Sequence, residues 1–129
     1  MDYFYWDASA LAKRYTTEVG TPIVNNLFTR STHARTMCLH ICTGEIISIL
    51  VRKKNAGILT DVVFTQAMSN FRSEVLDDDH FSLVSITNSL IEASYQLIEK
   101  YSLNATDALI LQSAVEAVTT FGRADNNLV

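Results

Sequence analysis

The sequence has no long hydrophobic run, and its pattern therefore excludes a membrane-spanning helix. No apolar stretch approaches the eighteen or so residues that a helix needs to cross a bilayer. The first residues show neither the basic segment nor the small-residue cleavage site of a signal peptide. The chain also contains no internal repeat and no low-complexity tract. We therefore expect a cytoplasmic protein with no membrane partner.

Charged residues are scarce as well, at 19% of the chain, whereas apolar residues make up 48%. This balance excludes a mainly disordered protein, because the apolar residues suffice for a core. A length of 129 residues suits one compact domain. We expect residues 1–129 to fold as that single domain.

Cysteine is limited to Cys38 and Cys42. With His40 between them they read Cys-x-His-x-Cys, a spacing that suggests zinc. A structural zinc ion usually takes four ligands, and no second Cys or His pair completes the set. We interpret the two cysteines as buried free thiols, the usual state of cysteine in a core.

The net charge is −4, which by itself is unfavourable for a nucleic-acid binder. The charges are unevenly distributed, however. Residues 1–72 contain eight Lys or Arg and five Asp or Glu, whereas residues 73–129 contain two and nine. The basic residues of the first part form either a footprint for a polyanion or a set of solvated helix faces. They are Lys13, Arg14, Arg30, Arg35, Arg52, Lys53, Lys54 and Arg72.

Short apolar runs alternate with helical patterns along the whole chain. Strands are predicted at residues 3–6, 34–39, 81–86 and 118–121, and helices at 8–15, 22–30, 41–54, 60–75, 88–101 and 105–117. Gly20-Thr21-Pro22 is typical of one helix ending and the next beginning, and Thr87 is placed to cap a helix. The alternation predicts a mostly parallel sheet of four or five strands with helices on both faces.

Four acidic residues stand in apolar surroundings. Asp7 follows residues 3–6, Glu45 is the only charge between residues 37 and 51, Asp107 opens an apolar helix, and Asp125 follows residues 118–121. Each has a structural explanation: Asp7 or Ser9 can cap a helix, Asp107 can favour a helix dipole, and Asp125 can be a loop acid. Glu45 is the hardest to explain in this way, because its neighbours leave little polar surface.

Together the four acids suggest a metal site. Two carboxylates about 4 Å apart repel by roughly 4 kcal/mol at an effective dielectric constant of 20, so a cluster of four requires a cation or bound protons. Mg²⁺ or Mn²⁺ fits such oxygen ligands, and it activates water and stabilises charge on a phosphoryl group. The chemistry that follows is phosphodiester hydrolysis.

Four segments resemble the motifs of PIN-domain ribonucleases, and most closely those of VapC-type toxins. They are Tyr5-Trp6-Asp7-Ala8-Ser9, Ile41-Cys42-Thr43-Gly44-Glu45, Ala105-Thr106-Asp107-Ala108 and Phe121-Gly122-Arg123-Ala124-Asp125. The resemblance covers essentially the whole chain. Gly122 and Arg123 depart from the family pattern, and the sequence ends at Val129, soon after the last acid, where members of the family usually continue through a closing segment.

The resemblance implies a three-layer sandwich and a Mg²⁺-dependent endoribonuclease. Asp7, Glu45, Asp107 and Asp125 would bind the metal, Ser9 would support Asp7, and Lys13 and Arg14 would hold RNA by its phosphates. A water activated by one or two metal ions would attack the scissile phosphorus. The resemblance further implies a homodimer and a cognate antitoxin, as in type II toxin–antitoxin pairs.

Two alternatives remain open. One is a catalytically weakened module of the same fold that acts through protein or RNA binding, which Arg123 and the end of the chain at Val129 favour. The other is phosphotransfer on a different doubly wound fold. A haloacid-dehalogenase-like site needs a second acid where Ser9 stands, and a receiver domain needs an acidic cluster and a late lysine that the chain lacks.

Overall fold

The computed structural model describes residues 3–30 and 35–125, without the side chains of residues 35 and 121–125. In this part of the chain three strands form one parallel sheet in the order β1-β2-β3. They are β1 (Tyr3–Trp6), β2 (Arg35–Leu39) and β3 (Phe81–Val84). Tyr5 pairs with Met37, and Met37 pairs with Ser82. The mixed α/β class and the parallel sheet confirm the prediction.

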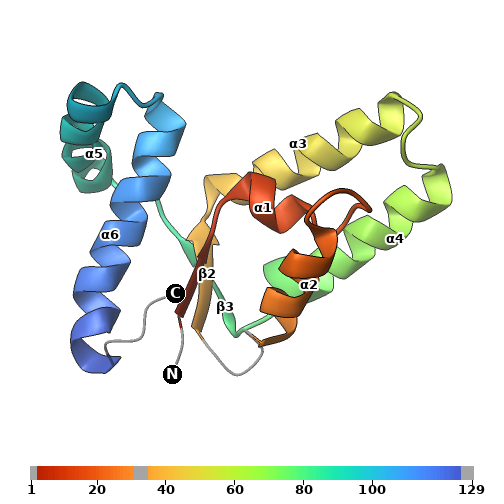
Figure 1. Ribbon diagram of the computed structural model, residues 1–129, viewed down its shortest axis with the longest axis horizontal. Helices are drawn as coiled ribbons and strands as arrows, with labels where there is room; N and C mark the ends of the chain where they lie inside the picture. Colours follow the sequence, from red (N-terminus) through yellow and green to blue (C-terminus); the bar gives the residue numbers. More distant parts are fainter. Residues whose placement is uncertain (1–2, 31–34, 126–129) are drawn as a thin grey trace.

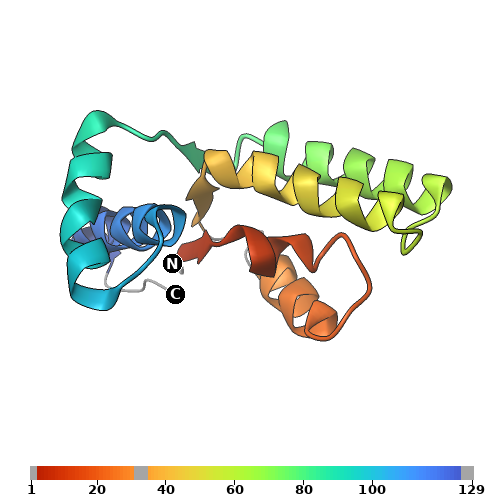
Figure 2. The ribbon, with the colours of Figure 1, turned by 90° about the horizontal axis from the view of Figure 1, so that it is seen from above.

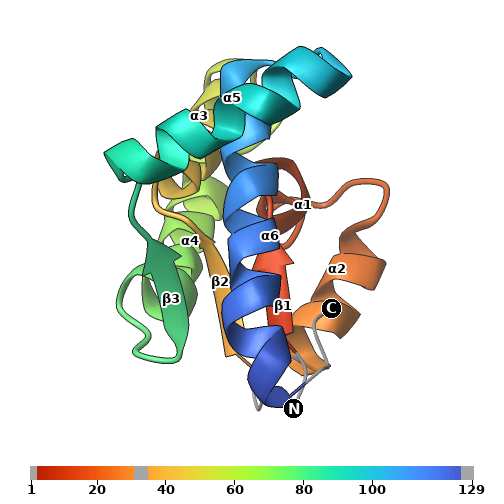
Figure 3. The same cartoon turned by 90° about the vertical axis from the view of Figure 1, so that its left-hand side faces the viewer.

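Helices cover the two faces of the sheet unequally (Figures 1 and 2). The first connection contains α1 (Ala8–Ala12) and α2 (Thr21–Arg30), and the second contains α3 (Ile41–Asn55), α4 (Asp61–Phe71) and the π-helical η2 (Arg72–Leu76). Because the strand order does not reverse, right-handed crossovers place both connections on the same face. The opposite face carries α5 (Asn88–Tyr101) and α6 (Ala105–Asp125), and Figure 3 shows α6 in front of the strands.

Strand β1 has apolar side chains on both faces, which explains its run of aromatic residues. Phe4 and Trp6 join the main core on the side of α1–α4, with their ring centroids 6.2 Å apart. Tyr3 and Tyr5 point the other way and pack in the cluster that contains Ala117 of α6. This alternation is the period of two that a strand imposes, and burial on both faces is typical of parallel sheets.

Most predicted helix boundaries agree with the structure. Asp7 caps α1, and Thr87 caps α5 by accepting a hydrogen bond from the Leu90 amide at 3.1 Å. Three helices differ from the prediction, among them α6, which ends at Asp125 rather than at residue 117. Helix α1 ends at Ala12 rather than at residue 15, and the helix predicted for residues 60–75 is divided into α4 and η2.

The predicted fourth strand at residues 118–121 is wrong, because these residues continue α6. Their β-branched and apolar composition indicated a buried strand, but the Val118 side chain is 48% exposed. The Thr119 hydroxyl donates to the Val115 carbonyl at 3.1 Å, and this bond to the preceding turn satisfies the hydroxyl inside a helix. Packing of α6 against α5 and the sheet outweighs the local strand propensity. The described sheet therefore has three strands rather than four or five.

Among the described residues, no helix combines the length and the apolar character that crossing a membrane requires.

Candidate functional site

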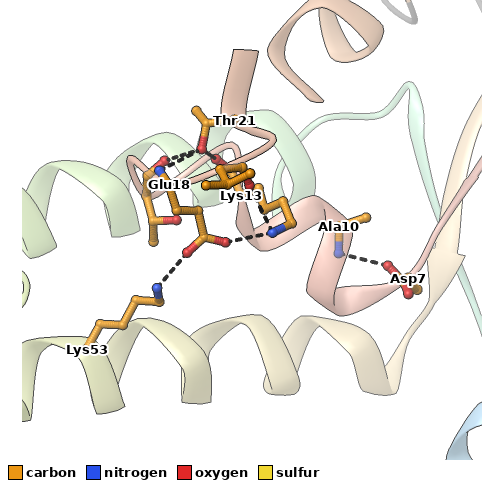
Figure 4. A network of polar contacts seen from close by, with 8 residues as sticks. Asp7, Ala10, Lys13, Glu18, Thr21 and Lys53 are labelled. Carbon is orange, nitrogen blue, oxygen red and sulfur yellow. Dashed lines mark hydrogen bonds and ion pairs between the residues drawn. The ribbon is translucent and has the colours of Figure 1, made fainter. Parts of the chain in front are cut away.

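Asp7 occupies the junction between β1 and α1, at the carboxyl end of the first strand. Its Oδ1 atom accepts a hydrogen bond from the Ala10 backbone amide at 2.8 Å, which caps the helix (Figure 4). The carboxylate is exposed, and the cap uses one of its two oxygens. Capping thus fixes the orientation of the carboxylate and leaves a second oxygen for a ligand.

Asp107 stands in the first turn of α6. Its backbone amide donates to Asn104 Oδ1 at 2.8 Å, and Asn104 Nδ2 donates to Asp107 Oδ2 at 3.0 Å. These reciprocal bonds tie the carboxylate to the start of the helix, as in a capping box. Asp107 also favours the positive end of the helix dipole. Its oxygen Oδ1 is outside this pair of bonds.

The two carboxylates share one pocket, although one hundred residues separate them in sequence. The pocket has a volume of about 410 Å³, within the range of small-ligand sites. It is lined by Tyr5, Trp6, Asp7, Ala10, Asp107, Ile110, Leu111 and Ala114. The lining carries two acidic groups and no basic group, so its charge favours a cation. The predicted convergence of acidic residues is thus present for this pair.

Glu45 does not line this pocket. It is half-buried in α3, one turn after Cys42. Burial, together with the negative charges of Glu45 and Asp7, raises the pKa of the Cys42 thiol to about 11. The Ala8 amide is also a hydrogen-bond neighbour of that thiol and lowers its pKa. Glu45 and Asp7 thus both lie within electrostatic range of Cys42, near the place where α1 packs on α3.

Asp125 is not brought to the pocket. It is the last residue of α6, and Asp107 is in the first turn of the same helix. Eighteen residues at 1.5 Å each place their backbones about 27 Å apart. Asp125 was expected to follow a fourth strand and so to reach the same sheet edge as Asp7, but that strand is part of α6. The side chain of Asp125 lies outside the described residues. Across residues 3–30 and 35–120, no three His, Cys, Asp or Glu side chains are grouped to hold a metal ion.

The expected supporting residue Ser9 is exposed on α1. Asp7 accepts its capping bond from the Ala10 amide, and no described hydrogen bond joins Ser9 to Asp7. The group that holds the Asp7 carboxylate is therefore the Ala10 backbone amide, where the resemblance implied the Ser9 hydroxyl.

The two basic residues expected to hold RNA are engaged in ion pairs. Lys13 Nζ lies 3.1 Å from Glu18 Oε1, and Lys53 Nζ lies 2.6 Å from Glu18 Oε2 (Figure 4). The Arg14 guanidinium bonds the Glu74 carboxylate, with Nη2 2.5 Å from Oε2. A phosphate would have to compete with these carboxylates for either residue.

The sequence interpretation missed the apolar wall of the pocket. Ile110, Leu111 and Ala114 follow Asp107 by three, four and seven residues, so they share its face of α6. Helical spacing counted from Asp107 is the signal that identifies them.

A second pocket of about 410 Å³ opens at the ends of β2 and β3. His40, Ile41, Thr43, Gly44, Ser85 and Ile86 line it. His40 is exposed here, whereas Cys38 and Cys42 are buried and free. The free, buried state of both thiols confirms the interpretation of the Cys-x-His-x-Cys segment.

Comparison with known proteins adds no relative: no family model matches the chain, and no curated protein matches it.

Proposed function

We propose that this chain is a Mg²⁺-dependent endoribonuclease of PIN-like fold, with Asp7 and Asp107 at the centre of its active site. One observation carries the proposal: both carboxylates line a single pocket at the carboxyl end of β1, from opposite ends of the sequence. Ligands of parallel α/β sheets bind at this edge. The order of the four sequence motifs that resemble PIN domains supports the same activity.

The donor set of the pocket fits Mg²⁺ or Mn²⁺. Magnesium sites commonly use one or two carboxylates and take their other ligands from water and substrate phosphates. Asp7 and Asp107 supply these two carboxylates, and Glu45, which like Asp7 lies within electrostatic range of Cys42, is the candidate for a third. When bound, the cation supplies a Lewis acid that activates water and offsets the charge of the scissile phosphate.

The residues of the chain prepare this site before any ligand arrives. The Ala10 amide orients Asp7, and the Asn104 side-chain amide orients Asp107. Ile110 and Leu111 form the apolar part of its wall. Carboxylates that are already oriented attract a cation without first reorganising, which is the basis of electrostatic preorganisation.

The resemblance extends the proposal to partners. A VapC-type toxin would form a homodimer and be inhibited by a cognate antitoxin. Lys13 remains a candidate phosphate contact, because its side chain is 35% exposed, but it would have to leave Glu18. A short reading frame for a DNA-binding protein next to the gene would support the toxin role over that of a solitary nuclease.

Cleavage of a labelled, mixed-sequence RNA tests the activity. The wild-type protein should cleave this RNA in the presence of Mg²⁺, and cleavage should stop when EDTA removes the metal. Asp7→Asn should lose at least a hundredfold in rate, because the metal loses a charged ligand. Asp61→Asn is the matched control, since Asp61 lies in the first turn of α4 with its side chain 90% exposed. Equal cleavage by wild type and Asp7→Asn would refute the assignment.

A second candidate function is RNA or protein binding by a catalytically weakened module. The position of Asp125 favours it, because a pocket with two acids has fewer metal ligands than the four expected. In that case the wild-type protein would retain RNA in a filter-binding assay, would not cleave it, and would show no metal affinity that depends on Asp7.

A further inference from the structure

A hydrogen bond between two hydroxyl groups links β1 to α6 beside the candidate pocket. The Tyr5 hydroxyl donates to the Ser113 hydroxyl across 108 residues of sequence. Tyr5 lines the pocket and precedes Asp7 by two residues. Ser113 is 3% exposed in the middle of α6. A buried hydroxyl pair is costly unless both members are bonded, so this contact is specific in geometry.

The side of α6 that is most deeply buried is built from small residues. Ala108, Ser113 and Ala117 are its fully buried positions among residues 105–120. Leu109 and Ile110 of the same helix add partly buried contacts with the main core. Other described side-chain hydrogen bonds of α6, such as Gln112–Glu116 and Thr119–Val115, stay within the helix, and those of Asp107 reach Asn104 just before it. The Tyr5–Ser113 bond therefore adds a directional link from the sheet to the middle of a helix that is otherwise held by apolar packing.

The rotation of α6 decides where Asp107 points. A side-chain tip lies about 5–6 Å from the helix axis, so a rotation of about 20° moves it by roughly 2 Å. A displacement of about 1 Å in a catalytic geometry can cost a hundredfold in rate. Ser113 faces the sheet, and Asp107 lies six residues earlier, close enough along the helix to follow its rotation.

We propose that Tyr5 and Ser113 are positioning residues: their hydrogen bond sets the rotation of α6 against β1 and so holds Asp107 opposite Asp7. The effect on metal affinity rests on the proposed function, whereas the effect on the geometry of Asp107 does not. Neither hydroxyl is required to touch the metal or the substrate.

Mn²⁺ titration followed by electron paramagnetic resonance tests the first effect. Tyr5→Phe removes the hydroxyl and keeps the ring, and Ser113→Ala removes the acceptor. Each variant should bind Mn²⁺ three- to tenfold more weakly while remaining folded. The double variant should be no weaker than either single variant, because both remove the same bond. Tyr95→Phe is the control, since Tyr95 is 53% exposed on α5.

The second effect is measured in metal-free protein by carboxylate ¹³C and amide NMR. Tyr5→Phe and Ser113→Ala should shift the Asp107 carboxylate and the Asn104 side-chain amide in the same direction, and Tyr95→Phe should leave both unchanged. Unmoved Asp107 and Asn104 signals would overturn the inference, even if the variants are less stable. Moved signals in a protein that binds no Mn²⁺ would support the positioning role and reject the nuclease.

Discussion

Arg14, in the turn that follows α1, and Glu74 of η2 are sixty residues apart in sequence and form an ion pair with several hydrogen bonds. Arg14 Nε lies 3.2 and 3.1 Å from the two Glu74 oxygens, and Nη2 lies 2.5 Å from Oε2. Arg14 Nη1 also donates to Asn25 Oδ1 at 3.1 Å, and the guanidinium lies 4.1 Å from the Phe28 ring centroid. One side chain thus joins the turn after α1 to both α2 and η2.

Replacing Arg14 should therefore reduce stability. We expect Arg14→Ala to cost about 2–3 kcal/mol, because it leaves the partly buried Glu74 carboxylate without its partner. Arg14→Lys should restore little, since an ammonium lacks the planar fork and the ring stacking. Urea unfolding measures both. An Arg14→Ala protein as stable as the wild type would mean that the guanidinium is free for another role.

Glu18 should make stability sensitive to acid. Hydrogen bonds from Lys53 and then Lys13 hold the pKa of its carboxyl below the ordinary value of 4.5. A lowered folded-state pKa gives stability that is present above pH 4.5 and is lost as the pH falls through the folded-state pKa. Glu18→Gln should cost about 1 kcal/mol or less at neutral pH and nothing in strong acid. Thermal unfolding of the wild type and Glu18→Gln across this pH range tests the prediction. A stability difference between the two proteins that stays constant with pH would contradict it.

The two thiols should resist labelling in the folded protein. Burial raises the pKa of Cys38 to about 12 and that of Cys42 to about 11, from an ordinary value of 9.0. Since the thiolate is the reactive form, a disulfide reagent at about pH 8 should react only as fast as the protein opens. Because both pKa values are raised, stability should fall as the pH rises from 9.0 through about 11. Rapid labelling of folded protein would contradict this burial.

Asp125 should be dispensable for metal binding. Its backbone lies about 27 Å from that of Asp107 along α6, so one ion cannot contact both. We expect Asp125→Asn to bind Mg²⁺ as the wild type does, whereas Asp107→Asn should bind at least tenfold more weakly. Equilibrium dialysis with Mn²⁺ compares the two. A large loss in Asp125→Asn would show that α6 ends differently from the helix described above.

Local signals in the sequence predicted much of the fold. The aromatic run at β1, the start of α2 after Gly20 and the Thr87 cap depend on neighbouring residues, and each appears where it was expected, whereas α1 ends at Ala12, well before Gly20. Residues 118–121 were predicted wrongly, because a β-branched apolar run fits either a strand or a helix packed on its neighbours. The choice was made by contacts of α6 with α5 and the sheet, which no local pattern contains.

The candidate site was predicted in part for the same reason. Acids in apolar surroundings pointed to Asp7 and Asp107, and both line the pocket. The ion-pair partners of the basic residues could not be predicted from the sequence. Glu74 is sixty residues from Arg14, and nothing near Arg14 in the sequence indicates that its charge is already paired.

Calorimetric titration with Mg²⁺ tests the central claim most directly, with Asp7→Asn and Asp7→Ala measured beside the wild type. Asparagine caps a helix about as well as aspartate, so Asp7→Asn isolates the charge, whereas Asp7→Ala also loses about 1 kcal/mol of capping. We predict that the wild type binds Mg²⁺ and that both variants bind it at least tenfold more weakly. Wild-type affinity in Asp7→Asn, or a wild-type protein that binds no Mg²⁺, would contradict the claim that Asp7 and Asp107 form a metal site.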